Sequence, residues 1–274
     1  MAVESITETA MIWGTVSGAS MVGMVISLLL SVGLPIFLGI FIYKKTKAWV
    51  PAFFIGCGIF VGFAMILEQI CHAIVLTVTG SAIRDNIWLY AIYGGLAAAL
   101  FEECGRWIAM TFCLKKHLTR ENALMYGAGH GGIEAFLILG MSSMSNLLTA
   151  AMINGGLMEK TMTALEPAQQ EVTYHQLSVL WTTPAYQFYL APVERISAIA
   201  LQIALSILVY SAVKTGRKLQ LAAAFGLHFA VDFLTVICAS MIPTWALELG
   251  LLVVVAVICA AVYKLVYVHS AEKK

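Results

Sequence analysis

The segment Phe101-Glu102-Glu103-Cys104-Gly105-Arg106 places two adjacent carboxylates and an arginine inside an apolar run from about residue 87 to 113. An apolar run of this length predicts a membrane-spanning helix. Each charge in mid-bilayer costs roughly 2.5–3.5 kcal/mol on the insertion scale, so three together need a reason. At helical spacing Arg106 adjoins both Glu102 and Glu103, and pairing with one leaves the other free. A free buried carboxylate suits general-base chemistry, and a structural ion pair between helices is the alternative.

The composition is that of a polytopic membrane protein. Of the 274 residues, 61% are hydrophobic and 11% are charged, whereas soluble domains carry about 25% charged residues. The net charge of +1 offers no basic surface for nucleic acid, so we expect membrane lipid and no nucleic acid as partners. The first residues include Glu4 and Glu8 and lack a basic segment, so no signal peptide is expected. The six cysteines lie in apolar runs without a CxxC pair, which predicts free thiols.

Seven apolar runs predict an all-α bundle of about seven transmembrane helices in a single integral-membrane domain, residues 1–274. The expected spans are residues 20–43, 50–78, 87–113, 122–148, 193–213, 219–241 and 247–268. Between the fourth and fifth spans lies one long polar outer loop, about residues 149–192. We expect it to form an ordered outer cap, with an interfacial helix near residues 176–189.

Positive charge predicts the orientation, because cytoplasmic loops are enriched in lysine and arginine. Most basic residues fall on alternate connections or at the C-terminus: Lys44, Lys45, Lys47, Lys115, Lys116, Arg120, Lys214, Arg217, Lys218, Lys264, Lys273 and Lys274. Only Arg84, Lys160 and Arg195 lie on the other side. We therefore predict an N-terminus outside the cell and a C-terminus in the cytosol.

Titratable residues on three predicted helices lie at a similar depth. A rise of 1.5 Å per residue puts Glu102 roughly 18 Å, His130 roughly 12 Å and Glu134 roughly 18 Å from the cytosolic end. The same count gives roughly 15 Å for His228 and 21 Å for Asp232. We expect these side chains to meet in one layer in the cytosolic half of the membrane.

Two further polar pairs are expected to lie outside this layer. Glu68 and His72 are four residues apart and roughly 27 Å from the cytosolic end, so we expect a structural hydrogen bond in the outer leaflet rather than a metal site. Glu194 and Arg195 open the fifth span, where a solvated ion pair at the outer interface is the expected arrangement.

The order Glu-Glu-x-x-Arg, aromatic-x-x-x-His and His-x-x-x-Asp on successive helices resembles a known superfamily of membrane proteases. It groups the type II CAAX prenyl proteases and bacteriocin-processing proteases with PrsW-type proteases and the γ-secretase scaffold subunit. Length, span count and the motif Gly-His-Gly-Gly-Ile-Glu at residues 129–134 are most similar to the bacterial YhfC family of intramembrane metalloproteases. The resemblance covers about residues 50–240. It implies a protein of the bacterial cell membrane that cleaves a membrane protein or peptide.

The resemblance also implies roles for the residues that match its motifs. By this resemblance, Glu102 or Glu103 is the catalytic glutamate. His130 is the histidine of the second motif, with Tyr126 at its aromatic position. His228 and Asp232 match the third motif. The first motif is one residue shorter than the Glu-Glu-x-x-x-Arg of CAAX proteases and closer to the PrsW pattern, so the choice between the two glutamates stays open. Glu134 is a carboxylate that the general pattern does not require.

Two chemistries fit these residues. In the first, Glu102 or Glu103 deprotonates a water also held by His130, the other glutamate pairs with Arg106, and His228 with Asp232 steadies the oxyanion. In the second, Zn²⁺ is bound by His130, His228 and either Glu134 or Asp232. Because the sequence has no HExxH motif, we prefer the metal-free mechanism and keep zinc as the alternative cofactor.

Two other classes of function remain alternatives at this point. An ion- or proton-coupled transporter would also bury charges in the membrane, and it predicts polar residues through the whole membrane thickness. A catalytically silent scaffold of the same superfamily predicts glutamates that are fully paired, without a cavity.

Overall fold

The computed structural model describes residues 11–269, and within this range every element is helical. Glu4, Glu8, Lys273 and Lys274 lie outside the described residues. The helices long and apolar enough to cross a membrane number seven among these residues: Gly18–Thr46, Pro51–Thr79, Ile87–Cys113, Arg120–Asn154, Ala185–Thr215, Lys218–Ala239 and Thr244–Tyr267. The prediction of a seven-helix transmembrane bundle is confirmed.

Several of these spans are interrupted by short π-helical segments or bounded by a 3-10 turn. In chain order the elements are α1 Gly18–Thr46, α2 Pro51–Phe60, η1 Val61–Glu68, α3 Gln69–Thr79, α4 Ile87–Ile108, η2 Ala109–Cys113, η3 Lys115–His117, α5 Arg120–Ala135, η4 Phe136–Gly140, α6 Met141–Asn154, α7 Leu157–Met162, α8 Pro167–Thr182, α9 Ala185–Thr215, α10 Lys218–Ala239, α11 Thr244–Val262 and η5 Tyr263–Tyr267. The two helices that carry most of the site begin at capping side chains. Asn86 accepts hydrogen bonds from the backbone N–H groups of Trp88 and Leu89, and Thr119 accepts one from Asn122.

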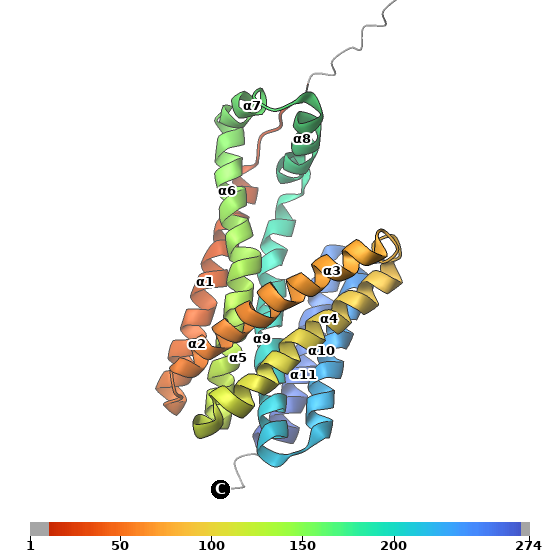
Figure 1. Ribbon diagram of the computed structural model, residues 1–274. Coiled ribbons are helices and arrows are strands. Elements are labelled where there is room, and N and C mark those ends of the chain that lie inside the picture. The colour runs from red at the N-terminus through yellow and green to blue at the C-terminus, as the bar shows by residue number, and fades with distance from the viewer. Residues whose placement is uncertain (1–10, 270–274) are drawn as a thin grey trace, which may run out of the picture.

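Helix α9 lies in the middle of the bundle, between α1 with α5–α6 on one side and α10–α11 on the other (Figure 1). Of the 18 consecutive residues that form the most apolar stretch of α9, 72% are buried inside the protein. In the corresponding stretch of the last span only 11% are buried. The last span therefore presents most of its side chains to lipid, whereas α9 is surrounded by protein. Polar side chains on α9 consequently meet those of its neighbouring helices.

Helices α2 and α5 approach at backbone distance because both are glycine-rich at the contact. A Cβ atom on Gly129 would collide with the carbonyl oxygen of Phe53, and one on Gly56 would collide with that of Tyr126. Only glycine permits such an approach. This contact fixes the part of α5 that carries His130 against α2.

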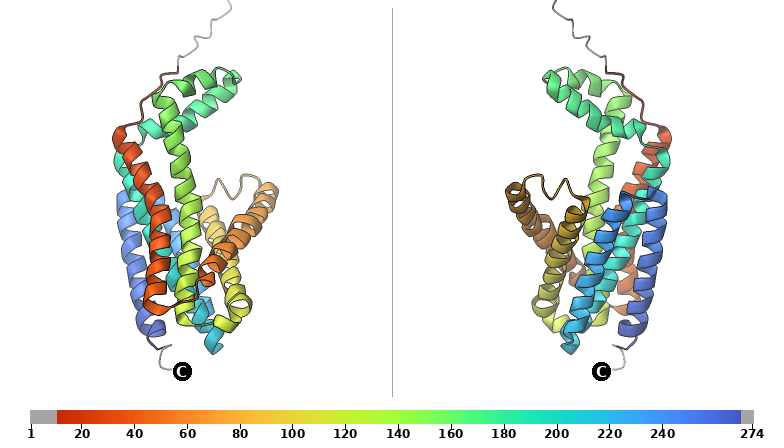
Figure 2. Two further views of the ribbon diagram at one scale, coloured as in Figure 1. Left: turned by 90° about the vertical axis from the view of Figure 1, so that its left-hand side faces the viewer. Right: turned by 90° about the vertical axis from the view of Figure 1, so that its right-hand side faces the viewer.

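The helix α2–η1–α3 and its partner α4 are inclined to the rest of the bundle (Figure 2). Their far ends, near the turn at residues 80–86, lean away from α5 and α6. An inclined helix gains less depth per residue than the full rise of 1.5 Å. Depths counted along this pair of helices are therefore overestimated.

The region predicted as one outer loop, about residues 149–192, is mostly helical. The fourth span continues to Asn154, α7 and α8 follow, and α9 begins at Ala185, so the connections between helices are short. The segment is tied to the start of the described chain, since Asn154 exchanges two hydrogen bonds with the backbone of Val16 (2.8 and 2.9 Å). The rings of Trp13 and Trp181 also pack together.

Candidate active site

Glu103 is the glutamate that pairs with the arginine. Nη1 of Arg106 donates to both of its carboxylate oxygens, at 2.8 and 3.1 Å, and Nδ1 of His228 lies 2.8 Å from Oε1. The three side chains come from α4 and α10, and all are buried. This network neutralises Glu103 and holds the imidazole of His228 in place.

Glu102 faces the neighbouring helix α5 instead. Its Oε2 lies 2.9 Å from Nε2 of His130 and accepts a hydrogen bond of 2.8 Å from Nε2 of Gln202. No hydrogen bond made within residues 11–269 uses its Oε1. Glu102 therefore keeps one carboxylate oxygen without a protein partner, and the two glutamates, adjacent in sequence, have different surroundings.

The ring of His130 is held from both sides. Its Nδ1 lies 3.4 Å from the hydroxyl of Tyr126, one turn earlier on α5, while Nε2 faces Glu102. A hydroxyl that donates to Nδ1 leaves the ring proton on Nε2, where it points at the carboxylate. Tyr126 and His130, four residues apart, therefore share one face of α5.

Glu134 lies in the same network, but its cationic partner comes from the pair expected at the outer interface. Nη1 of Arg195 donates to Oε1 of Glu134 at 3.2 Å, and Arg195 also binds Glu194. Arg195 is only 8% exposed. The prediction of a solvated pair is therefore wrong, because α9 begins at Ala185 and carries Arg195 well below the end of the span.

Gln202 was not recognised in the sequence, although it connects the site. It donates to Glu102 and to Oε2 of Glu134 (2.9 Å) and accepts a hydrogen bond from Arg106. Its side chain is 3% exposed. An amide in the middle of an apolar span was the available signal, since a buried polar group needs partners.

His228 and Asp232, one turn apart on α10, both contribute to the site. Nε2 of His228 lies 3.5 Å from Oδ2 of Asp232 and 3.9 Å from Oε2 of Glu102. The imidazole of His228 has its shorter contact with Glu103 rather than with Asp232, so both carboxylates orient the ring. Asp232 is the more open group, with a side chain 36% exposed.

A cavity of about 110 Å³ adjoins these residues and extends between α9, α10 and α11. The polar side chains that line it include Glu102, Glu134, Arg195, Gln202, His228 and Asp232. Since a water needs about 10–15 Å³ of such space, the cavity has room for several. Its remaining lining includes Thr235 and Leu251, which lie near the ends of α10 and α11 remote from the basic connections. The cavity thus extends toward the predicted outer side, and access from the cytosol stays a prediction.

Glu68 and His72 lie side by side, with 3.2 Å between Oε1 and Nε2, and the hydrogen bond expected between them stays a prediction. His72 also contacts the hydroxyl of Tyr93 at 2.8 Å. Glu68 and His72 do not line the cavity at Glu102, and their place in the outer leaflet stays a prediction.

One group of donor atoms among the described residues fits a metal ion: Glu102, His130 and Glu134, all within 4.8 Å of one another and all buried. This set differs from the expected one, because His228 is engaged by Glu103 rather than grouped with His130. One imidazole and two carboxylates form a mixed nitrogen and oxygen set, which suits a divalent first-row metal. The residues present therefore fit such an ion.

Comparison of the sequence with known proteins shows its family. The model of the YhfC intramembrane metalloprotease family matches residues 30–259, which include every residue of the site. The chain belongs to this family. It is 43% identical over 204 residues to a protein of Bacillus subtilis (strain 168) described as uncharacterized membrane protein YhfC. The aligned region covers 71% of this chain and 76% of that relative. No solved structure matches. The chain is thus an integral protein of the bacterial cell membrane from a family of intramembrane metalloproteases, and the wider superfamily stays a prediction.

Proposed function

We propose that this member of the YhfC family is an intramembrane peptidase in which Glu102 activates the attacking water. One observation carries the assignment. Glu102 lines the cavity with its Oε1 unbonded within residues 11–269, whereas both oxygens of Glu103 are bound by Arg106. A general base needs a free oxygen within reach of water. The substrate is a membrane protein or peptide, since the cavity lies within the lipid-embedded bundle.

In the proposed reaction, Oε1 of Glu102 accepts a proton from a water in the cavity as the water oxygen bonds to the peptide carbonyl carbon. The C–N bond then breaks, and the proton passes from Glu102 to the leaving amine. His130 and Gln202 hold Oε2 and so orient the carboxylate. General-base catalysis contributes about 10²–10⁴-fold to such reactions.

His228 is proposed to stabilise the oxyanion. Glu103 fixes the ring through Nδ1, and Nε2 is directed toward Glu102 and Asp232, both of which line the cavity. As an imidazolium, the ring donates a hydrogen bond from Nε2 to the developing negative charge. A preorganised donor in a site shielded from bulk water is most effective.

The donor group of Glu102, His130 and Glu134 supports a second form of the same activity, a metallopeptidase. These three residues would hold the ion, which would supply Lewis-acid polarisation and a more acidic bound water. Gln202, which bonds both carboxylates, would then position two metal ligands. In this form Arg195 still balances the charge of Glu134.

The test is cleavage of dye-labelled transmembrane peptides by the purified protein in liposomes, with products identified by mass spectrometry. We expect Glu102→Gln, His130→Ala and His228→Ala each to lose at least about 100-fold in rate, within the range for general acid–base groups. Glu68→Gln is the matched control, because Glu68 has the same 7% exposure as Glu102 and also contacts a histidine, but does not line the cavity. Equal cleavage rates for wild type, Glu102→Gln and Glu103→Gln would instead establish a structural glutamate pair, and no cleavage by the wild type would favour the silent scaffold.

The metal form is tested by measuring bound metal in the purified wild type and in Glu134→Gln, together with inhibition by 1,10-phenanthroline. If the protein is a metallopeptidase, the purified wild type retains about one metal ion per chain and the Glu134→Gln variant retains none. Wild type inhibited by 1,10-phenanthroline then regains activity when zinc is added back. Activity that persists with no bound metal supports the glutamate mechanism alone.

A further inference from the structure

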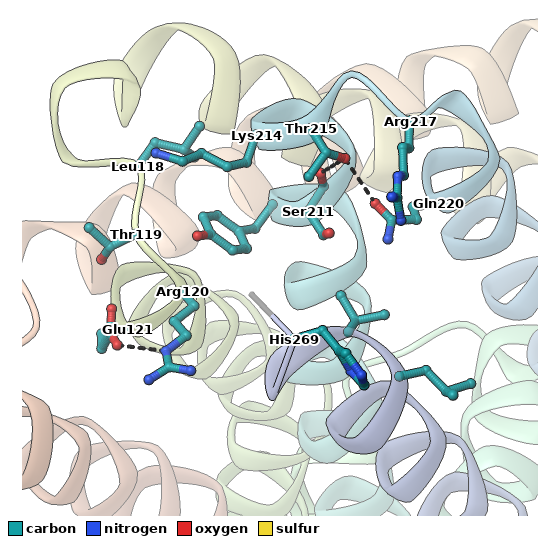
Figure 3. A pocket seen from close by; sticks show the side chains of 13 residues that line it. Leu118, Thr119, Arg120, Glu121, Ser211, Lys214, Thr215, Arg217, Gln220 and His269 are labelled. Atoms are coloured by element: carbon teal, nitrogen blue, oxygen red, sulfur yellow. Dashed lines mark hydrogen bonds and ion pairs between the residues drawn. The ribbon is translucent and has the colours of Figure 1, made fainter. Parts of the chain in front are cut away.

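A second cavity, of about 590 Å³, lies at the opposite side of the bundle from α7 and α8, where the basic connections gather (Figure 3). Four helix ends surround it: the start of α5, the end of α9, the start of α10 and the end of η5. It shares no lining residue with the cavity at Glu102. Volumes of about 300–1,000 Å³ are typical of small-molecule sites.

The lining is cationic, and part of its charge is uncompensated. Arg120 is paired with Glu121 at 2.8 Å. The side chains of Lys214 and Arg217, by contrast, have no hydrogen-bond or ion-pair partner within residues 11–269. Gln220 adds a polar group beside them. Figure 3 shows Lys214 extending toward Leu118 and Arg217 lying beside Gln220, so basic side chains line different sides of the cavity. Such a lining is complementary to an anion.

A separate apolar groove of about 340 Å³ lies beside this cavity, along α5, α9 and α11. On α5, Arg120 lines the cavity and Leu124, one turn later, lines the groove. On α9, Ser211 and Ile207 have the same relation. The guanidinium of Arg120, which lines the cavity, lies 4.6 Å from the ring centroid of Tyr267, which lines the groove, so the two spaces adjoin across this contact.

We propose that this composite site binds one anionic glycerophospholipid, with its phosphate at Lys214 and Arg217 and an acyl chain in the groove. A free phosphate ion would use the cationic residues but not the groove. Anionic lipids are concentrated in the leaflet that faces basic connections, where lysine and arginine bind them. The bound lipid would join the ends of α5, α9 and η5, and it is independent of the peptidase proposed above.

The experiment is native mass spectrometry of the full-length protein with dioleoyl phosphatidylglycerol, dioleoyl phosphatidylcholine, glycerol phosphate or inorganic phosphate. We expect retained phosphatidylglycerol and about 25-fold weaker binding in the double variant Lys214→Ala/Arg217→Ala, since each of the two basic residues near an anionic surface favours lipid binding about fivefold. The matched control is Lys115→Ala/Lys116→Ala, at the same end of the bundle but outside the cavity.

Three results would overturn the proposal. The first is equal binding of phosphatidylglycerol by both double variants, which would indicate general attraction to the basic end. The second is equal binding of glycerol phosphate, inorganic phosphate and the lipid, which would indicate a site for a free anion. The third is equal retention of phosphatidylcholine, which would show that the basic residues do not select the headgroup.

Discussion

The layer around Glu102 and the cavity around Lys214 are both polar, but the protein pairs their charges differently. In the layer, Arg106 is 0% exposed and bonds Glu103 and Gln202. In the cavity, Lys214 and Arg217 are exposed, and their side chains have no partner within residues 11–269. A charge out of reach of water must be paired within the protein, whereas a charge at the membrane surface is solvated. The layer is consequently part of the fold, and the cavity is free to take a ligand.

The largest effect expected from this comparison is that of Arg106→Ala. The change leaves Glu103 buried beside His228 without its arginine, and removing one partner of a buried ion pair typically costs about 3–5 kcal/mol. We expect a marked fall in the thermal unfolding midpoint of the protein in detergent. Arg84→Ala, at an exposed arginine in the α3–α4 turn, is the control and should leave the midpoint unchanged.

A double variant sharpens this prediction. If the cost of Arg106→Ala comes from the stranded carboxylate, Arg106→Ala combined with Glu103→Gln should be less unstable than the sum of the two single variants. Additive effects would show that packing of the arginine, rather than its charge, stabilises the layer.

An intermediate effect is expected for Gly129→Ala. The added methyl group would meet the backbone of Phe53 and force α2 and α5 apart, at a cost of about 1–3 kcal/mol for overpacking. Gly58→Ala on α2 is the matched control, because nothing lies within 4 Å of its Cβ position. The comparison of the two unfolding midpoints checks the prediction, and equal midpoints would contradict it.

The smallest effect is expected in the cavity. Lys214→Ala and Arg217→Ala should change the stability of the delipidated protein by no more than about 0.5 kcal/mol, since exposed residues without partners contribute little. A loss comparable with that of Arg106→Ala would show that these side chains are structural, and the contrast between the two regions would fail.

The sequence alone determined the seven spans, because the hydrophobic thickness of a bilayer sets the length of an apolar helix. It also determined which residues share a face of one helix, such as His130 with Tyr126, since the helical period is fixed locally. The common layer of Glu102, His130 and His228 could be predicted because a similar number of residues separates each of them from the basic end of its span.

Only the tertiary structure decided which residues meet across helices. The assignment of Arg106 to Glu103, the burial of Arg195 beside Glu134 and the bridging position of Gln202 depend on the rotation and inclination of each helix. Helix rotation and tilt are set by packing against neighbours, such as the close contact of Gly129 with Phe53, and not by hydropathy. For this reason the sequence predicted a pair of candidate glutamates, and the packing of α4 against α5 and α9 distinguished Glu102 from Glu103.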